Sequence, residues 1–418
     1  MLSRRMAWLV AMVATLTMTV SFIDRLTLAV LAPSVTKALD ISEEAYGWLG
    51  SAFSMAYLVG TPFAGWWIDR VGARRGLISS VLAWSAVAAL HALIPGFGML
   101  FALRLALGLT EGPGFPGAAQ TAQRILPASE RERGFGVLFT GSSFGAMLVP
   151  PLATLVFRHA GWRAAFLLTS AAGLLWIPLW MAVTRSRDVR AQLDLPAATA
   201  THLTHPAAPR PSFLELVSHP LLLRALCAIS AAAPVFSFPQ TWGAKYLVRT
   251  FGVTQGDVGH YLWLPPLIFD AGTVLFGDLA SRQRRAEGAP PRMLFAIGAA
   301  LAGSLVLLPL VETPWQSIVV LGVSAAGAGT IYALVTSDLL ARMPPGSTSL
   351  AVGIIASAQS LALVIVNPVI GRTVDRLHSY SEVAISLAAW VIPGSLVWLC
   401  WRPAIRFASR RSPAHATG

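Results

Sequence analysis

Charged residues and cysteines are scarce in this sequence. Only 12% of its 418 residues are charged, whereas 55% are hydrophobic and the mean hydropathy is +0.64. Soluble domains carry about a quarter charged residues, so this composition excludes an ordinary soluble protein and indicates an integral membrane chain. The two cysteines, Cys227 and Cys400, lie in different apolar segments. Neither a disulfide framework nor a metal site has support, no motif requires a cofactor, and we expect both cysteines to be packing residues.

Long apolar runs follow one another along the whole chain. A helix needs about 20 mostly apolar residues to cross a bilayer, and twelve such segments can be placed. We therefore expect an all-α membrane protein with twelve transmembrane helices. The predicted segments are 7–33, 45–66, 76–94, 98–123, 134–157, 163–184, 222–246, 258–280, 292–311, 316–341, 349–371 and 383–401.

The net charge of +12 has a topological explanation. If both termini are cytoplasmic and a residue at the end of a segment is counted with the adjoining loop, 22 of the 31 Lys and Arg fall on cytoplasmic loops or tails, seven fall outside, and only Arg25 and Arg104 lie deep within segments. This asymmetry follows the positive-inside rule and predicts a multi-pass protein with both termini in the cytoplasm. Because the rule accounts for the basic excess, nucleic acid is not an expected partner.

The segment 185–220 divides the chain into two halves. It is rich in Arg and Pro and has no apolar stretch long enough to span. We expect a six-helix bundle at 1–184, a cytoplasmic linker at 185–220, and a second bundle with a short basic tail at 221–418. The halves echo each other, because "GWWIDRVGARR" follows the second segment and "GDLASRQRR" follows the eighth. Such repeats are typical of transporters with a site between two bundles.

Two further matches to known patterns are interpreted as coincidences. "GRTVDR" at 371–376 repeats the G-x-x-x-D-R spacing but falls on the outer side of the predicted topology. "GSSFG" at 141–145 fits a hydrolase nucleophile elbow, but it lies within a predicted helix, where Gly141 and Gly145 favour close helix packing. The sequence offers no credible nucleophile or metal cluster, so we do not expect an enzyme.

The loop after the second segment carries a specific signal. Its spacing, G-x-x-x-D-R-x-G-x-R-R, resembles the signature loop of the major facilitator superfamily at every defining position. Glycine at the first position permits close helix approach, and the aspartate can cap a helix start and pair with an arginine, so that the loop latches the cytoplasmic side in one state. The predicted gate residues are Gly65, Asp69, Arg70, Gly72, Arg74 and Arg75.

Charged residues also occur inside the apolar segments. Such residues cost several kcal/mol unless they pair or face a watery cavity, so they are functional candidates. Asp24 and Arg25 are adjacent in the first segment and point about 100° apart, which suits two different partners. The alternative is that both lie at a helix end and reach the membrane surface.

The fourth segment contains an arginine and a glutamate on one face. Arg104 and Glu111 are two turns apart, about 10 Å along the helix, too far for direct neutralisation. Arg104 keeps its charge and needs an anion from another helix or from a substrate. Glu111 can become neutral when buried and thus carry a proton, or it can simply fasten helix 4 to helix 1. Pro113 and Pro116 predict a bend directly after it.

Four stretches make the resemblance narrower. "IDRLTLAVLAP", "YGWLGSAFSMAYLVG", "GWWIDRVGARRG" and "LRLALGLTEGPGFP" together resemble the anion:cation symporter family within that superfamily, particularly its hexuronate and galactonate transporters, and the region of helices 7 and 8 agrees. The resemblance implies that Arg25 and Arg104 contact a substrate carboxylate and that Tyr57 donates to the substrate. It also implies that Asp24 and Glu111 are the proton-coupling acids.

Part of the predicted site departs from that family. Where its members carry an Asn early in helix 11, this chain has Ser357 or Gln359 as candidates. Helix 7 offers Gln240 and Trp242 as substrate contacts, with packing or a helix kink as the alternative. Asp270 in helix 8 is protonated, water-exposed or a further coupling acid.

Charge counting completes the functional hypothesis. Two arginines and two ionised acids leave an empty cavity neutral, so a monoanion requires one proton, on Glu111, to restore neutrality. We expect a proton-coupled symporter of an organic carboxylate. The resemblance implies that this carboxylate is a sugar acid such as a hexuronate or aldonate, and that the protein lies in the inner membrane. The alternatives are a small aliphatic or aromatic monocarboxylate as substrate, sodium as the coupling ion, an exporting antiporter, and a sensor without transport. A monomer suffices for this architecture.

Overall fold

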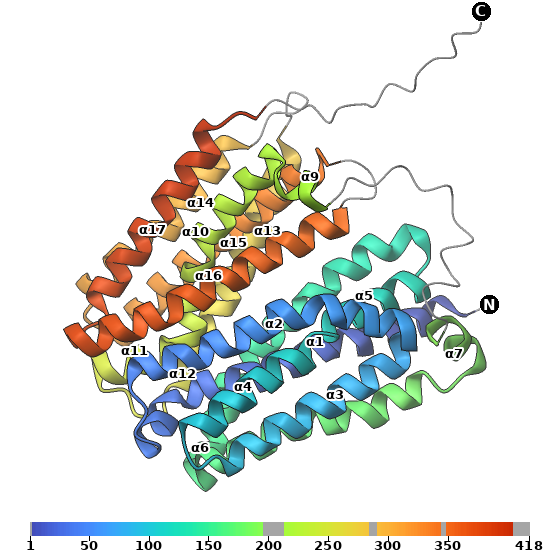
Figure 1. The fold of residues 1–418 in the computed structure, drawn as a ribbon, viewed down its shortest axis with the longest axis horizontal. Helices are drawn as coiled ribbons and strands as arrows, with labels where there is room; N and C mark the ends of the chain where they lie inside the picture. Colours follow the sequence, from blue (N-terminus) through green and yellow to red (C-terminus); the bar gives the residue numbers. More distant parts are fainter. Residues whose placement is uncertain (1, 195–212, 284–290, 344–347, 404–418) are drawn as a thin grey trace, which may run out of the picture.

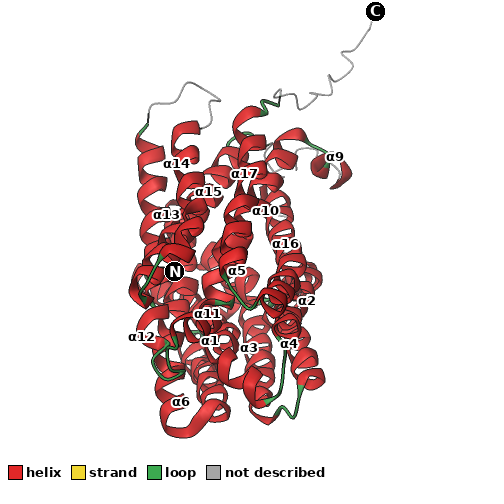
Figure 2. Ribbon diagram, turned by 90° about the vertical axis from the view of Figure 1, so that its left-hand side faces the viewer, coloured by secondary structure: helices red, strands yellow, loops and turns green. Residues whose placement is uncertain are grey.

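The protein is built from helices throughout the part of the chain that the computed structural model describes, residues 2–194, 213–283, 291–343 and 348–403 (Figures 1 and 2). This confirms the all-α prediction. The first half contains α1 (Arg4–Ala38), α2 (Glu43–Val71), α3 (Ala73–Leu90), η1 (His91–Leu93), α4 (Phe97–Glu111), α5 (Gly114–Ile125), η2 (Ala128–Glu130) and α6 (Arg131–Val183). The connecting region and second half contain α7 (Arg187–Leu193), α9 (Phe213–Val217), α10 (Pro220–Thr241), α11 (Gly243–Phe251), α12 (Gly259–Leu262), α13 (Leu264–Arg282), α14 (Arg292–Ala302), η3 (Gly303–Leu310), α15 (Pro314–Leu340), α16 (Thr348–Leu377) and α17 (Ser381–Cys400).

These elements form twelve rods of membrane-spanning length. Nine helices in the described ranges are long and apolar enough to cross a bilayer by themselves. One of the nine, α6, consists of two rods that join at Gly161, whose φ of 77° breaks the helical path. The other two rods are α2, with 29 residues, and the α4–α5 pair. The twelve predicted segments are therefore confirmed.

The predicted bend after Glu111 is also present. α4 ends at Glu111 and α5 begins at Gly114. Pro116 then lies in the first turn of α5, where its missing N–H removes no intrahelical hydrogen bond. The sequence "GPGFPG" thus interrupts this rod at the depth where it carries its glutamate.

Small residues allow the helices of the first half to approach closely. A Cβ atom on Gly141 would lie 2.6 Å from the backbone oxygen of Thr15, and one on Gly145 would lie 2.5 Å from that of Thr19. The Thr19 hydroxyl donates to the backbone oxygen of Gly141 at 2.9 Å. The packing interpretation of "GSSFG" is confirmed, because both glycines lie at the contact between α6 and α1.

Large apolar side chains cover the outside. Leu175, Val274 and Leu310 are each more than 70% exposed, as expected for a surface that faces lipid tails. Cys227 and Cys400 are free and exposed, so the expectation that they are packing residues was wrong. A cysteine fits an apolar segment on any face of its helix, so the sequence alone does not show whether it points toward other helices or toward lipid.

The helices form two bundles that meet at one end. We call α1–α6 the N-bundle and α10–α17 the C-bundle. The inner end is the one that carries Leu2, α7 and α9, and the outer end lies opposite. Figure 1 shows α2 and α16 converging toward the outer end and separating toward the inner end. One buried apolar cluster joins both bundles and includes Leu31 and Leu49 with Leu247, whereas a second cluster contains residues of the first half only. The two bundles are therefore closed together at the outer end and apart at the inner end.

The start of the predicted linker is folded against the N-bundle. Val189 and Leu193 of α7 are fully buried. Gly72, with φ 84°, lies so close that a Cβ atom there would be 2.6 Å from the backbone oxygen of Leu193. An ion pair of 3.6 Å joins Arg74 to Asp194. The signature loop thus supports the first part of the linker, while residues 195–212 lie outside the described ranges.

Candidate functional site: a charged cluster between the bundles

The charged residues of α1 and α4 meet inside the N-bundle. The Arg25 guanidinium donates through Nε and Nη2 to Glu111 Oε2, at 3.0 and 2.8 Å. The Ser21 hydroxyl donates to the same oxygen at 2.8 Å. Glu111 is only 2% exposed, so this carboxylate is removed from water and held by charge-assisted bonds. Glu111 therefore joins helix 4 to helix 1 in this conformation.

Asp24 does not take part in that pair. Its side chain is buried, and neither of its oxygens has a hydrogen-bond partner among the described residues. Arg25 thus has a partner of its own, as expected, whereas the second partner expected for Asp24 is absent among the described residues. A buried acid without donors is costly as an anion, which makes Asp24 a group whose charge can change.

Arg104 is a buried cation of a different kind. Its side chain is buried, its Nε atom has no acceptor, and its two terminal nitrogens lie 3.3 and 3.5 Å from the backbone oxygen of Arg25. No ion pair in the described part of the chain includes Arg104. A guanidinium with a carbonyl as its acceptor retains full attraction for an anion.

Aromatic rings surround these cations. The Arg25 guanidinium carbon lies 4.8 Å from the ring centre of Phe22, 4.6 Å from that of Phe53 and 5.1 Å from that of Tyr57. Phe53 also lies 5.1 Å from the guanidinium carbon of Arg104. Cation–π contacts of this kind hold the guanidinium groups in place while excluding water. The two guanidinium groups thus form a cationic site that is bounded by aromatic rings.

Glycine sets the distance between α2 and α4. A Cβ atom on Gly108 would lie 2.5 Å from the backbone oxygen of Phe53. This close approach brings the aromatic residues of α2 against the charged face of α4. Glu111 follows Gly108 by three residues and ends α4, which places its carboxylate beside α1.

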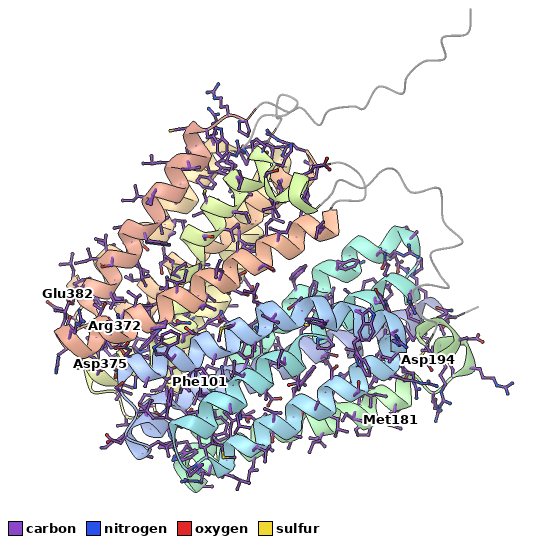
Figure 3. All side chains as sticks on the ribbon, in the orientation of Figure 1. Phe101, Met181, Asp194, Arg372, Asp375 and Glu382 are labelled. Atoms are coloured by element: carbon purple, nitrogen blue, oxygen red, sulfur yellow. The ribbon has the colours of Figure 1, made fainter. Side chains whose placement is uncertain are left out.

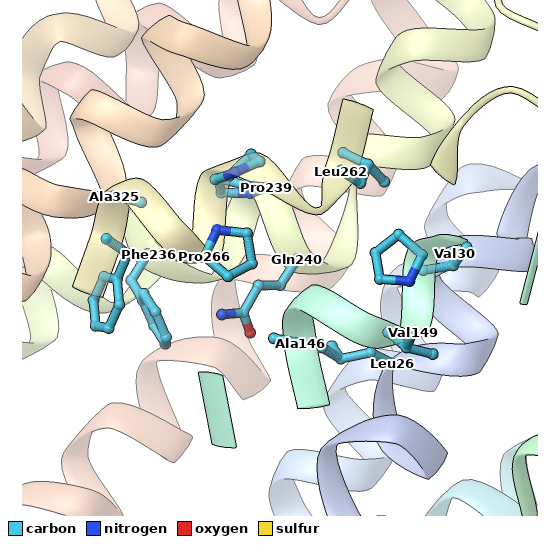
Figure 4. Close-up of a pocket in the computed structure, with 13 residues that line it drawn as sticks. Leu26, Val30, Ala146, Val149, Phe236, Pro239, Gln240, Leu262, Pro266 and Ala325 are labelled. Atoms are coloured by element: carbon cyan, nitrogen blue, oxygen red, sulfur yellow. The ribbon is translucent and has the colours of Figure 1, made fainter. Parts of the chain in front are cut away.

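The C-bundle contributes a mostly apolar wall. A pocket between the bundles is lined by Leu26 and Ala146 on one side and by Phe236 and Phe269 on the other, whose ring centres are 4.6 Å apart. Figure 4 shows Gln240 extending its amide group into this space. Gln240 is the polar side chain of that lining, so the predicted helix 7 contact does lie in a cavity between the halves.

Asp270 connects the two bundles near the pocket. Its Oδ1 accepts a hydrogen bond of 2.7 Å from the hydroxyl of Ser143, which belongs to α6 of the N-bundle. Asp270 follows the pocket residue Phe269 directly in α13. The acid expected in helix 8 therefore lies at the bundle interface with a hydroxyl partner.

Other predicted contacts lie elsewhere. Trp242 is fully buried, and its indole N–H donates to Asn367 Oδ1 at 3.3 Å. Asn367 lies against Gly47 of α2, where the two bundles meet near the outer end. The structure thus places Trp242 in the packing role that was the alternative. Ser357 and Gln359 are half-buried on α16, and no hydrogen bond joins them to Arg25, Arg104 or Glu111 within the described residues.

The signature loop is only partly engaged. A Cβ atom on Gly65 would meet nothing within 4 Å, so the predicted close approach is absent in this inward-open form. Asp69 accepts from the Gln120 side chain at 2.8 Å rather than capping a helix. Arg70 lies over the Trp66 ring at 5.4 Å. Arg74 donates to the Thr184 hydroxyl in addition to pairing with Asp194, and Arg75 is exposed.

Two polar residues of the site were missed from the sequence. Ser21 precedes Arg25 by four residues and therefore shares its helix face, a spacing that could have identified it. Ser143 lies inside "GSSFG", which was interpreted for its glycines alone. Serine is common in membrane helices as a packing residue, so its presence gave little signal.

Comparison with known proteins shows the family to which the chain is similar. The family model described as Major Facilitator Superfamily matches residues 13–366. The chain is 26% identical over 420 residues to the hexuronate transporter of Escherichia coli (strain K12), with 96% of each chain covered. It is 24% identical to the probable galactarate/D-glucarate transporter of Bacillus subtilis (strain 168), covering 94% of this chain and 91% of the other. It is 22% identical to a D-galactonate transporter of Escherichia coli O6:H1, covering 94% and 95%.

A solved structure shares the fold. A bacterial homologue of the human lysosomal transporter Spinster, in an inward-facing and unoccupied conformation, aligns with a TM-score of 0.78 at 16% identity, covering 96% of this chain and all of that one. The likeness shows that this chain has the same fold as that transporter.

Proposed function

The chain belongs to the major facilitator superfamily, and from this premise we propose that it is a secondary active transporter that carries an organic carboxylate together with a proton. The superfamily and the relatives are transporters rather than enzymes. The observation that carries the proposal is Arg104, a buried cation without an acid partner in the described chain, beside the Arg25–Glu111 pair. An anionic substrate supplies the negative partner that Arg104 lacks among the described residues.

Glu111 provides the coupling. In the empty site it occupies the donors of Arg25. When Glu111 accepts a proton, Arg25 is released and can bind the substrate carboxylate together with Arg104. Proton and substrate then compensate each other's charge while the bundles move past one another. One proton balances a monoanion if Asp24 stays ionised, and a second is carried if Asp24 also titrates.

Other polar residues complete the proposed site. Tyr57 lies against Arg25, and we propose that it donates its hydroxyl to the substrate. Gln240 faces the interface between the bundles from the C-bundle side. Ser357 or Gln359 is proposed to approach the substrate when the inner end closes. Asp270, which accepts from Ser143 across the interface, is proposed as an additional acid whose protonation accompanies bundle movement.

The proposed substrates are sugar acids. Hexuronate, galactarate, D-glucarate and D-galactonate appear in the names of the relatives. A second candidate, a small aliphatic or aromatic monocarboxylate, is favoured by the pocket, in which Gln240 is accompanied by Phe236, Phe269 and several other apolar residues. Hydroxyl groups of a sugar acid need more hydrogen-bond partners than this wall provides. A transport assay with acids of both classes distinguishes these two candidates.

Orientation and gating follow from the same family. We propose an inner-membrane monomer with cytoplasmic termini, in which 1–184 and 221–418 form the two moving bundles and 185–220 forms the linker. The signature loop is proposed to latch the inner end when the transporter faces outward. Its residues are Gly65, Asp69, Arg70, Gly72, Arg74 and Arg75.

Reconstituted protein tests the proposal. Proteoliposomes with an internal pH indicator receive sugar acids and simple carboxylates outside, with and without sodium. We expect internal acidification with one class of acid and no sodium requirement. Glu111→Gln should keep counterflow of that acid but lose pH-driven accumulation, whereas Glu312→Gln, which changes an exposed outer-loop carboxylate, should leave both unchanged. Accumulation retained by the Glu111 variant would refute its coupling role, and counterflow without acidification would indicate exchange or sodium coupling.

A further inference from the structure

The N-terminus of α2 is capped by a residue from the other bundle. Asp375, near the end of α16, accepts from the backbone N–H of Glu43 through Oδ1 at 3.1 Å and from that of Glu44 through Oδ2 at 2.8 Å. These amides belong to the first turn of α2, where the helix itself supplies no acceptor. Ser42, the residue before α2, caps only the N–H of Ala45. The cap of α2 is therefore shared between the two bundles.

Backbone contact accompanies this cap. A Cβ atom on Gly371 would lie 2.1 Å from the backbone oxygen of Glu43, and one on Gly47 would lie 2.3 Å from that of Asn367. The helices can therefore touch only because both positions lack a side chain. The carboxylate of Asp375 also lies at the positive end of the α2 dipole, which strengthens the two hydrogen bonds.

Charged pairs surround the contact. Arg372 donates to the Glu44 carboxylate, and Lys245 lies 3.1 Å from the carboxylate of Glu43. Figure 3 shows Arg372 and Asp375 together at the outer end, where α16 reaches α2. The Arg372–Glu44 pair is about half exposed on the arginine side, so water and salt screen it, whereas the backbone cap depends on geometry.

The segment involved is "GRTVDR" at 371–376, which repeats the G-x-x-x-D-R spacing found at 65–70. Its first and fifth residues, Gly371 and Asp375, make the contact and the cap. The copy at the inner end of α2 behaves differently in this conformation, because Gly65 meets nothing and Asp69 bonds Gln120 of its own bundle. α2 and α16 are antiparallel, and each carries this spacing near its C-terminal end. The two copies therefore lie at opposite ends of the molecule, and only the outer copy makes contacts between the bundles in this conformation.

We propose that Gly371 and Asp375 form an outer latch, which holds α2 against α16 in the inward-open form and must release before the outer end can open. The latch sets the ratio of inward-open to outward-open molecules in the absence of substrate. Removing the cap leaves two amides of α2 without acceptors only while the outer end is closed, so the closed form alone loses stability. We expect the ratio to move toward outward-open by about tenfold.

Distance measurements between spin labels test the latch without any substrate. The labels are attached through Lys37→Cys and Glu312→Cys in a Cys227→Ser, Cys400→Ser background. Lys37 and Glu312 are both exposed at the outer end and belong to different bundles. Asp375→Ala should increase the long-distance population relative to the parent about tenfold, and the isosteric Asp375→Asn should do so to a smaller extent. Glu382→Gln, which removes an exposed carboxylate in the first turn of α17, is the matched control and should leave the distances unchanged.

A second variant separates the cap from the surface charges. Arg372→Gln removes the exposed ion pair but keeps Asp375, so we expect less than a twofold change, which disappears in high salt. The proposal is overturned if both Asp375 variants give the parent distances, or if the Glu382 or Arg372 variant shifts them as much as Asp375→Ala does. Failure to accumulate substrate would bear on the coupling proposal, whereas these distances bear on the latch alone.

Discussion

Arg25 and Arg104 have the same charge and lie side by side, but among the described residues only Arg25 is paired with an acid. Arg25 donates twice to Glu111, while Arg104 has the backbone oxygen of Arg25 as its acceptor. A buried ion pair contributes little net stability, yet removing one member leaves the other uncompensated. The two arginines should therefore respond differently to the same substitution.

Arg25→Gln should destabilise the empty protein, because it strands the buried Glu111 carboxylate at a cost of about 3 kcal/mol. Arg104→Gln should leave thermal stability near that of the parent, since it strands no acid, but should abolish stabilisation by substrate. Thermal unfolding of the purified protein with and without the transported acid measures both effects. The double variant Arg25→Gln, Glu111→Gln is the control and should recover the stability that the single Arg25 variant loses. Equal melting temperatures for the two single arginine variants would contradict this assignment.

Among the helices, the contact of α1 with α6 depends on two glycines. Gly145→Ala places a Cβ atom 2.5 Å from the backbone oxygen of Thr19, and a backbone atom cannot rotate away as a side chain can. We expect a loss of about 1–3 kcal/mol, measured as a lower melting temperature. Gly136→Ala on the same helix is the matched control, because a Cβ atom there meets nothing within 4 Å. If both variants melt together, the packing argument fails.

The helices themselves were predictable because their signal is long and redundant. Each rod needs about 20 apolar residues, so one substitution does not hide it, and the predicted segments differ from the observed helices mainly at their ends. The break after Glu111 was equally readable, because proline and glycine act on the backbone locally. Helix 7 continues as α11 beyond the predicted segment, after a break at Trp242 that lies within it.

Pairing within the site was less predictable, since it depends on how helices pack. The partner of Glu111 became clear only when Gly108 and the break at Gly112 placed α4 against α2 and α1. Trp242 could have faced the cavity or the closure, and only the position of Asn367 on α16 decides. "GRTVDR" was interpreted as a coincidence because it falls on the outer side of the predicted topology. Its partner, the start of α2, is more than 300 residues away in the chain, so nothing in the sequence indicated the contact.

The whole molecule is closed at its outer end and open at its inner end, so contacts needed for the opposite state are absent here. Gly65 is the clearest example, because nothing lies within 4 Å of a Cβ atom at this position. Gly65→Leu should therefore leave thermal stability unchanged in the inward-open form but prevent α2 from closing the inner end, slowing transport at least about tenfold. Initial rates in proteoliposomes and melting temperatures, with Gly98→Leu at the outer end of α4 as an equally uncrowded control, separate these effects. A parent-like rate would mean that the inner closure leaves room for a side chain at residue 65, and a lower melting temperature would mean that Gly65 already packs in the inward-open form.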